Sequence, residues 1–414
     1  MADPAATVEH VVRTVADPTH ITTAVSRSAA STLNDGLPGT ALLLAALSPT
    51  DPSLAPAAEH HWDAAASLLA GAPPDGIYSG PGALAASLLI GSAYLPEPRV
   101  QRTALEHATS WLAARAQGLA HHQRKRLSGG QRGTPWGVYD AIKGLSGIGR
   151  ILLAADQTGH APAVPGLTDA LTALTEMINT PVGHLPGWWL PAHDHLLPVA
   201  GALSPSGAAT TGLAHGIAGP LAFLSLAAVA DRTVPAQLDA IRTAAAWLLR
   251  WSAPGGSWPA HISGDALRQP PNRDHLATAP GRRDAWCYGA AGIGSALTHA
   301  GRALHDGELV HAGQTAVASL AQRPAEHWDT DGPGLCHGTA GVLQAIHRSG
   351  CSQAGRRAAA LTTPLLPPDG NQDIRSGNLG FLTGATGVAL VLAETQGLLP
   401  TTNTIAWDAL LLLS

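Results

Sequence analysis

The sequence is poor in cysteine and in charge. Three cysteines, at positions 287, 336 and 351, are too few and odd in number for a disulfide framework, so a metal or catalytic use is favoured. Charged residues make up 13%, well below the roughly one quarter typical of soluble domains, so much of the chain must be buried or in loops. A net charge of −5 gives no general attraction to nucleic acid, and we expect no such partner.

The sequence also lacks long hydrophobic runs and a targeting segment. Its amino end has neither the basic start nor the apolar stretch of a signal peptide. The longest apolar runs, such as residues 41–47, are far too short to cross a bilayer. We therefore expect a cytoplasmic protein without membrane insertion.

Glycine, in contrast, is abundant and recurs in a four-residue turn. The turn occurs seven times, at residues 36–39, 79–82, 144–147, 216–219, 289–292, 338–341 and 384–387. The last glycines of successive turns are 43, 65, 72, 73, 49 and 46 residues apart. A unit of about 45 residues suits two helices with their loops. Glycine there would permit left-handed backbone angles and close approach of neighbouring helices.

Each turn is followed by an apolar segment and then, in most units, by an amphipathic one. The segments after the turns, apolar nearly all round, predict buried helices at 40–47, 83–90, 148–155, 220–230, 293–300, 342–347 and 388–394. Amphipathic segments predict outer helices at 56–69, 100–116, 167–177, 236–251, 308–321 and 352–361. We expect one domain, residues 1–414, forming an all-α toroid of about seven inner and seven outer helices.

The three longest intervals between turns predict loops at the rim of the toroid, where binding loops usually lie. Residues 121–134 read as a basic, glycine-rich loop, and residues 180–206 and 252–284 are rich in proline and tryptophan. The basic run could meet an acidic leader peptide or a dehydratase, although such runs are usually solvated. Histidines 184, 193, 195 and 261 have no ligand spacing, and Cys351 does not fit a ligand pattern.

Residues with metal-binding side chains come just before some of the turns. The position before the first glycine holds His215, Tyr288 and His337, and the position before that holds Cys287 and Cys336. Because each turn precedes an inner helix, these side chains should gather at one end of the toroid, where helix N-termini favour thiolates. The two cysteines and His337 could form a zinc site with one open position, the catalytic pattern. Alternatively, the cysteines are small apolar core residues.

Two motifs resemble those of a known family. Residues 286–289 (Trp-Cys-Tyr-Gly) and 336–338 (Cys-His-Gly), together with the repeated turns, are similar to the lanthionine synthetase C-like family of LanC-type lanthipeptide cyclases, from residue 36 to about 407. The resemblance implies a zinc enzyme that adds peptide cysteine thiols to dehydroalanine or dehydrobutyrine, forming lanthionine or methyllanthionine rings. Its substrate would be a precursor peptide, leader plus core, dehydrated by a separate dehydratase.

The resemblance also implies the site residues. Cys287, Cys336 and His337 match the zinc ligands, and the residues expected to act in catalysis are His215, Asp140, Arg283, Tyr288 and Trp286. Histidine is suited to proton transfer near neutral pH, so His215 would protonate the enolate. Asp140 could orient His215 or take the thiol proton, and Arg283 could stabilise the enolate oxygen or a carbonyl. A core histidine, a capping aspartate and a solvated arginine are the plainer interpretations.

Two further functions stay open at this point. The first is a glutathione-binding or glutathione-adding protein, as in the LanC-like branch of the family, without ring formation. The second is a toroidal glycoside hydrolase, which needs two placed carboxylates. Few acidic residues lie near the turns, and Asp35 and Asp140 are the clearest of them. A glycoside hydrolase is therefore the least favoured function.

Overall fold

The computed structural model describes residues 3–95, 102–195, 204–253, 255–272, 276, 283–323, 327–350, 378–400 and 405–414. The expected outer helix at 352–361, Cys351, Arg282 and His275 lie outside these residues. No helix in the described ranges is long and apolar enough to span a membrane.

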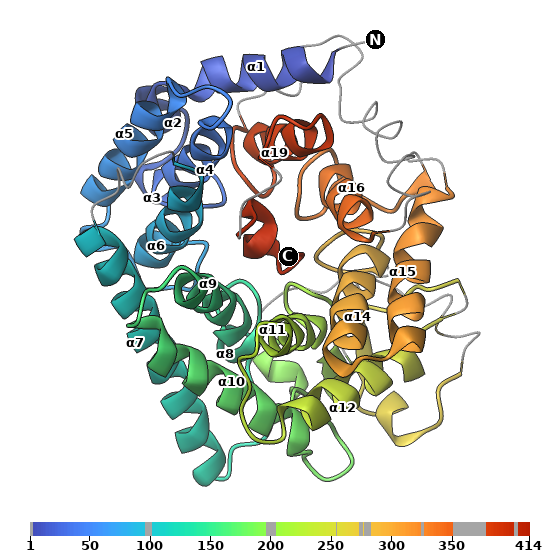
Figure 1. The fold of residues 1–414 in the computed structure, drawn as a ribbon. Helices are drawn as coiled ribbons and strands as arrows, with labels where there is room; N and C mark the ends of the chain where they lie inside the picture. The colour runs from blue at the N-terminus through green and yellow to red at the C-terminus, as the bar shows by residue number, and fades with distance from the viewer. Residues whose placement is uncertain are drawn as a thin grey trace.

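The fold is an α/α toroid in which the seven helices that follow the glycine turns form a closed inner ring (Figure 1). Each contacts the next along the chain, and the last contacts the first, which closes the ring. All or nearly all of their residues are buried, as expected from their lack of a polar face. The inner helices are α4 (Leu37–Leu47), α6 (Gly80–Gly91), α9 (Leu145–Gln157), α11 (Ala218–Val229), α14 (Ala290–Leu304), α16 (Thr339–Arg348) and α19 (Ala385–Thr395).

An outer layer of amphipathic helices packs on this ring (Figure 1). The expected outer helices are present wherever the structure describes the chain, as α5 (Leu54–Ser67), α7 (Arg102–Ser128), α10 (Ala163–Asn179), α12 (Gln237–Arg250) and α15 (Gly307–Ala321). A further outer helix not expected from the sequence, α1 (Pro4–Val15), starts at an Asp3 cap and covers α19 with Val8, Val11 and Val15 buried. The first helix of the chain therefore covers the last inner helix.

The basic run expected in a loop is helical instead. α7 continues to Ser128, so histidines and basic residues at 121–126 form its last turns, and only the residues after it are loop. Lys125 and Arg126 lie in the last turn, where basic charge is favourable near the helix C-terminus. Arg124 pairs with Asp169 of α10 at 3.4 Å, which places this run on the outer layer of the toroid.

The turn glycines are required by close approach to main-chain oxygens. At the last glycine of each turn, an added Cβ would collide with the carbonyl oxygen of the residue six positions earlier. At Gly39 it would lie 2.5 Å from the oxygen of Leu33, and at Gly219 it would lie 2.7 Å from that of Leu213. These glycines have no positive φ angle, so close approach is the operative reason and left-handed geometry is not.

The segments that precede the inner helices are joined in a closed ring of main-chain hydrogen bonds, here called the turn belt. In each bond an N–H of one segment reaches a carbonyl of the next segment, and the last segment returns to the first. Neighbouring repeats are thereby held in a fixed register at one end of the toroid. The bonds run Leu33→Tyr78, Ile77→Ile142, Ala141→Ala214, Leu213→Cys287, Cys287→Cys336, Cys336→Leu382 and Phe381→Asn34, at 2.7–3.3 Å.

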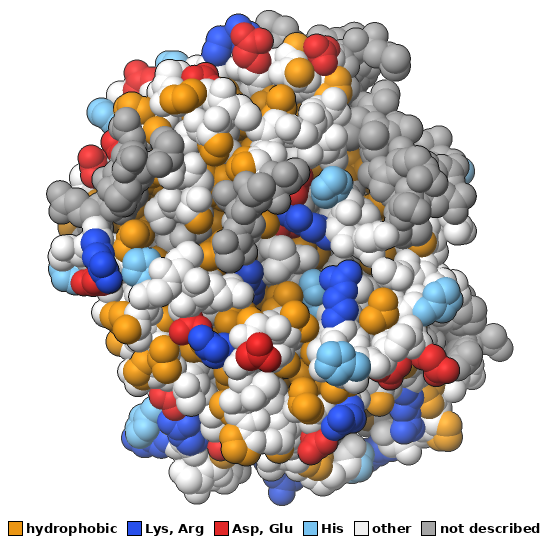
Figure 2. All heavy atoms as spheres, viewed as in Figure 1, with side chains coloured by type: hydrophobic (Ala, Val, Ile, Leu, Met, Phe, Trp, Pro, Cys, Tyr) orange, Lys and Arg blue, Asp and Glu red, His pale blue; other side chains and the backbone are white. Residues whose placement is uncertain are grey.

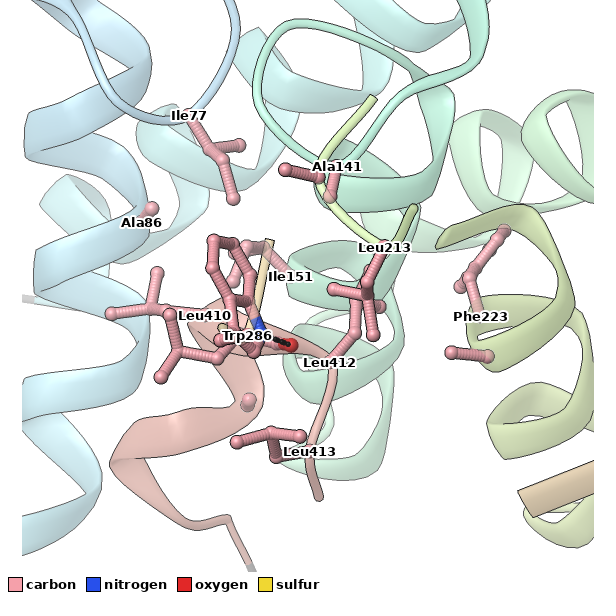
Figure 3. Close-up of a cluster of buried hydrophobic side chains, with 14 of the residues drawn as sticks. Ile77, Ala86, Ala141, Ile151, Leu213, Phe223, Trp286, Leu410, Leu412 and Leu413 are labelled. Atoms are coloured by element: carbon pink, nitrogen blue, oxygen red, sulfur yellow. Dashed lines mark hydrogen bonds between the residues drawn. The ribbon is translucent and has the colours of Figure 1, made fainter. Parts of the chain in front are cut away.

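The centre of the ring is filled by the segment at 405–414, which includes the 3-10 helix η6 (Trp407–Leu411). Tyr78 donates a hydrogen bond to the main-chain oxygen of Leu410 at 2.6 Å, and Arg150 bonds that of Ser414 at 2.8 Å. In Figure 3 the side chains of Leu410, Leu412 and Leu413 lie among those of the inner helices. The toroid is therefore a packed core with no open channel at this point.

Smaller elements complete the described chain. The strands β1 (Ala208–Thr210) and β2 (His261–Ser263) pair antiparallel and bring the loops before His215 and before Trp286 together. The remaining elements are α2 (Pro18–Ala24), α3 (Arg27–Ala30), η1 (Ser92–Tyr94), α8 (Trp136–Tyr139), η2 (Ala192–Asp194) and η3 (Ala266–Arg268). Two loop tryptophans expected at the rim, Trp188 and Trp258, are buried.

Buried histidines should make the fold sensitive to mild acid. Burial lowers the pKa of His61 and of His299 to about 4, because the charged ring is poorly solvated there. The unfolded chain takes up protons below about pH 6.5, where these folded rings stay neutral. The free energy of unfolding therefore rises with pH through this window. The contribution of the two neutral histidines to stability is complete above about pH 6.5 and is lost as the pH falls toward 4.

This prediction is measured with thermal unfolding of the wild type and of His299→Leu between pH 7 and pH 5. Nε2 of His299 is buried without a hydrogen-bond partner among the described residues, so leucine removes the titrating group and an unsatisfied atom together. We expect a smaller fall in Tm with acidification for the variant. An equal fall in both proteins would show that His299 does not cause the pH dependence.

Candidate metal centre and its surroundings

Four consecutive segments of the turn belt carry the residues singled out by the sequence. Asp140 lies in the third segment, His215 in the fourth, Cys287 in the fifth, and Cys336 with His337 in the sixth. The N–H of Cys287 bonds the carbonyl oxygen of Cys336 at 3.3 Å, so the belt itself places the two cysteines side by side. Residues up to about 200 positions apart in sequence thus meet at one end of the toroid.

Cys287, Cys336 and His337 form a group able to bind a metal ion. Their ligand atoms all lie within 4.8 Å of one another, and Sγ of Cys287 is 2.9 Å from Nδ1 of His337. Cys287 is buried, Cys336 is partly buried and His337 is exposed. Two sulfurs and one imidazole nitrogen at this separation fit the bond lengths of about 2.0–2.3 Å that zinc forms with such donors.

The protonation states of the group also favour metal binding. The pKa of Cys287 is lowered, first by its hydrogen bond with Cys336 and then by that with His337. Burial acts in the opposite direction but does not outweigh these bonds. The same bond to Cys287 and burial raise the pKa of Cys336, while Cys287 raises that of His337. One thiolate is therefore stabilised by its two neighbours, and a metal ion would take over that role.

His215 and Asp140 form a hydrogen-bonded pair beside the cysteines. Nδ1 of His215 lies 2.7 Å from Oδ2 of the buried Asp140. The other carboxylate oxygen, Oδ1, accepts hydrogen bonds from the N–H groups of Ile142, Lys143 and Gly144 at 2.7–3.1 Å. Asp140 therefore caps the turn and orients the imidazole at the same time. Its carboxylate fixes a proton on Nδ1 of His215 and leaves Nε2 for a substrate.

Two residues that hold His215 were not found from the sequence. Trp136, at the start of α8, stacks on the His215 ring with centroids 5.5 Å apart and planes 25° apart. Tyr139, at the end of α8, donates a hydrogen bond from its hydroxyl to the main-chain oxygen of His215 at 3.2 Å. Their place directly before Asp140 in sequence was the available signal, because residues before other turns reach the same end of the ring.

Tyr288 faces the same space as His215, with ring centroids 6.5 Å apart. Burial raises the pKa of Tyr288, and the neighbouring Cys287 raises it further, so the phenol keeps its proton. It can therefore act as a hydrogen-bond donor next to the metal-binding group.

Arg283 connects the two segments that supply the metal ligands. Its Nη1 lies 2.7 Å from Oδ2 of Asp331 and 4.0 Å from the nearer oxygen of Asp329. Asp331 in turn donates its N–H to the carbonyl oxygen of His337 at 2.8 Å. The guanidinium therefore ties the Cys287 segment to the His337 segment, and its charge is partly neutralised by the two carboxylates.

Trp286 lies away from the open side of the group. Its side chain is fully buried among Ile77, Ala141, Leu213 and Leu410, and Nε1 donates to the main-chain oxygen of Leu411 at 2.8 Å (Figure 3). In this position the Trp286 side chain supports Cys287 from the core side. Its part in catalysis stays a prediction, and any such effect would act through Cys287.

The chain resembles known proteins in sequence and in fold. The sequence profile of the family described as lanthionine synthetase C-like protein matches residues 28–397. The nisin biosynthesis protein NisC of Lactococcus lactis subsp. lactis is 26% identical over 209 residues, which are 50% of this chain. The match spans 48% of that protein, so it covers about half of the relative's length.

A solved structure, titled nisin cyclase, shares the fold. It superposes with a TM-score of 0.77 and covers 98% of this chain and 97% of its own, at 22% sequence identity. The profile match extends over most of the chain and includes all four belt segments that carry the site. The chain belongs to the lanthionine synthetase C-like family.

Proposed function

We propose that this protein is a zinc-dependent lanthipeptide cyclase. It would add cysteine thiols of a precursor peptide to dehydroalanine or dehydrobutyrine residues of the same peptide and so form thioether rings. The observation that carries the proposal is the convergence of Cys287, Cys336 and His337 within 4.8 Å, beside the paired His215 and Asp140. Membership of the family and the nisin cyclase fold support the same conclusion.

Cys287, Cys336 and His337 would hold the zinc ion and leave one position open, as is usual for catalytic zinc. Bound there, the ion would lower the pKa of a substrate thiol so that the thiolate is available at neutral pH. The two sulfur ligands already carry negative charge, which keeps the net charge of the site low. A nucleophile in this site can therefore remain electron-rich.

The protein's own residues would manage the proton that the reaction requires. Addition of sulfur to the β-carbon breaks the carbon–carbon π bond and leaves an enolate, which needs a proton at the α-carbon. His215 is oriented through Nδ1 by Asp140, so Nε2 can deliver this proton and recover one from solvent. Asp140 is engaged by three N–H groups and the imidazole, which favours an orienting role over removal of the thiol proton.

The surroundings suit an uncharged peptide segment. Tyr288 offers a protonated phenol, and Arg283 retains N–H donors beyond those on Asp331. The substrate would be a precursor peptide, leader plus core, whose serine and threonine residues a separate dehydratase has converted. We also infer that residues 1–414 act as one domain, because the last inner helix, α19, contacts both the first inner helix, α4, and the amino-terminal α1.

The proposal is tested by incubating the protein with a dehydrated precursor peptide, with and without a metal chelator. Free thiols are then alkylated and counted by mass spectrometry, since ring formation itself leaves the mass unchanged. We expect thiols to disappear only when the metal is retained. Persistence of all thiols over a range of dehydrated peptides would contradict the proposal, and a gain of the mass of glutathione would favour the glutathione-adding alternative.

A further inference from the structure

The imidazole of His261 lies in the same group of rings as His215, as does that of His195, which neighbours Trp136 and His261. Trp136 stacks on both histidines, at a centroid distance of 5.5 Å from His215 and 6.3 Å from His261. Tyr288 also neighbours both, at 6.5 Å and 6.3 Å. The four rings form a closed circuit with the two histidines at opposite corners. The position of His261 in the sequence had indicated no role for it.

The small β-sheet is what brings His261 to this place. Thr210 of β1 is paired with His261 of β2, and Thr210 Oγ1 lies 3.3 Å from Nδ1 of the imidazole. Thr211 continues the pairing, with its N–H on the oxygen of Ala260 at 3.1 Å and its hydroxyl on that of Pro259 at 2.7 Å. Both threonines are buried and lie just before His215 in the chain. One ribbon therefore positions both histidines.

The two imidazoles are held in the same way. Nδ1 of His215 is bonded to Asp140, and Nδ1 of His261 is bonded to Thr210. Within the described residues, the printed side-chain hydrogen bonds of both histidines are made through Nδ1, and both side chains are partly exposed. Both rings also neighbour Tyr288, the residue that directly follows Cys287 in the chain.

Their chemistry differs because their partners differ. Asp140 is an acceptor and keeps a proton on Nδ1 of His215, whereas a threonine hydroxyl can donate to Nδ1 of His261. With the hydroxyl as the donor, the ring proton of His261 would lie on Nε2. Burial, together with His195, lowers the pKa of His261 to about 4, so the ring is neutral near pH 7. A neutral imidazole N–H can polarise a carbonyl group.

We propose that His261 donates a hydrogen bond from Nε2–H to the acyl oxygen of the dehydro residue while the thiol adds to its β-carbon. This inference rests on the function proposed above. As the carbon–sulfur bond forms, the π electrons of the alkene move toward the acyl oxygen, where the donor stabilises them. His215 on the opposite side then supplies the proton to the α-carbon, the carbonyl reforms and the thiol proton has left to solvent.

His261 is better placed than Arg283 to donate a hydrogen bond to the acyl oxygen of the dehydro residue. Arg283 is held by Asp331 and lies near Asp329, which partly neutralise its charge and fix its direction. His261 would donate from Nε2, and it is separated from His215 by the rings of Trp136 and Tyr288. It also belongs to a paired strand, which holds it in place. Rigid, preoriented donors stabilise developing charge without reorganisation during the reaction.

The test compares His261→Phe, which keeps an aromatic ring without the donor, with His261→Gln, whose amide can donate from a similar reach. We expect His261→Phe to keep its zinc and its KM, and to lose about 10²- to 10³-fold in kcat for ring formation. His261→Gln should recover at least about tenfold of that loss, and the shape of the pH profile should not change. His193→Ala, an exposed loop histidine, is the matched control.

A second readout does not depend on activity. The ¹⁵N NMR signals of His261 should show the Nε2–H tautomer in the wild type and a mixture of tautomers in Thr210→Val. Wild-type kcat in His261→Phe, equal losses in the Phe and Gln variants, or an Nδ1–H tautomer would each overturn the inference. Should the wild type form no rings, the proposed function fails, while the tautomer measurement still supports or contradicts the assignment of His261.

Discussion

A Cys336→Ala variant is expected to lose its zinc and its ring-forming activity together. Removal of one ligand should weaken zinc binding by more than the roughly 10- to 100-fold that loss of an outer-shell partner costs. The remaining Cys287 and His337 are two of the three donors that lie within reach among the described residues, too few to hold the ion firmly. Activity should therefore fall to the level seen in the presence of a chelator.

The fold should survive this change. The belt uses the main-chain N–H and carbonyl of Cys336, bonded to Leu382 and Cys287, and alanine keeps both. Zinc content by elemental analysis, circular dichroism and thiol counts on a dehydrated peptide would be measured together. Cys351→Ala is the matched control, because it removes a thiol outside the expected ligand set. Equal zinc content in the wild type and Cys336→Ala would refute the ligand assignment.

A His215→Ala variant is expected to keep its zinc and still lose activity. The histidine lies outside the metal-binding group, so its removal leaves the ligands intact, and loss of a proton donor typically costs about 10²- to 10⁴-fold in rate. The change should appear in kcat, because the substrate thiol can still bind. Zinc loss equal to that of Cys336→Ala would instead make His215 a ligand.

Asp140→Asn separates the orienting role of the carboxylate from its capping role. The amide oxygen can still accept from the N–H groups of Ile142, Lys143 and Gly144, so the turn is preserved. The amide nitrogen, however, would face Nδ1 of His215 and favour the opposite tautomer, which costs about 10⁴-fold in an aspartate–histidine pair of this kind. Near wild-type kcat in this variant would show that the pair has no part in catalysis.

Charges of both signs occur on the described part of one face of the toroid. Figure 2 shows acidic and basic side chains interspersed with apolar ones over the face of the ring seen in Figure 1.

The inner ring could be predicted from the sequence because its pattern is local and repeated. A glycine turn followed by an apolar segment requires a helix buried on all sides, and this holds for every helix from α4 to α19 in the ring. α1 was not predicted because it precedes the first turn and has no glycine before it. The extension of α7 through its basic end was missed because charge was taken as a sign of loop.

The candidate metal ligands were also visible in the sequence, since Cys287 and Cys336 occupy equivalent positions in successive repeats and His337 directly follows Cys336. Repeat register alone places equivalent residues at one end of the toroid, and the belt makes adjacent repeats touch. The burial of Trp286 was not visible. Whether a side chain faces the site or the core depends on the segment that fills the ring, which lies about 125 residues further along the chain.

The ring circuit around His215 could not be predicted for a different reason. His261 reaches it through a pairing of two three-residue strands, too short to leave a clear pattern, and Trp136 through one short helix. Such contacts come from long-range pairing within irregular loops. These contacts depend on how the neighbouring inner helices fix the ends of the loops, which no local sequence pattern records.

The central claim is that two sulfurs and one imidazole hold a single zinc ion with room for a substrate thiol. X-ray absorption at the zinc edge tests it most directly, on the purified protein before and after addition of a thiol-bearing peptide. We predict two sulfur donors and one histidine nitrogen at first, and three sulfur donors once the peptide is bound. A set of four protein donors that does not change when the peptide is added would contradict the account.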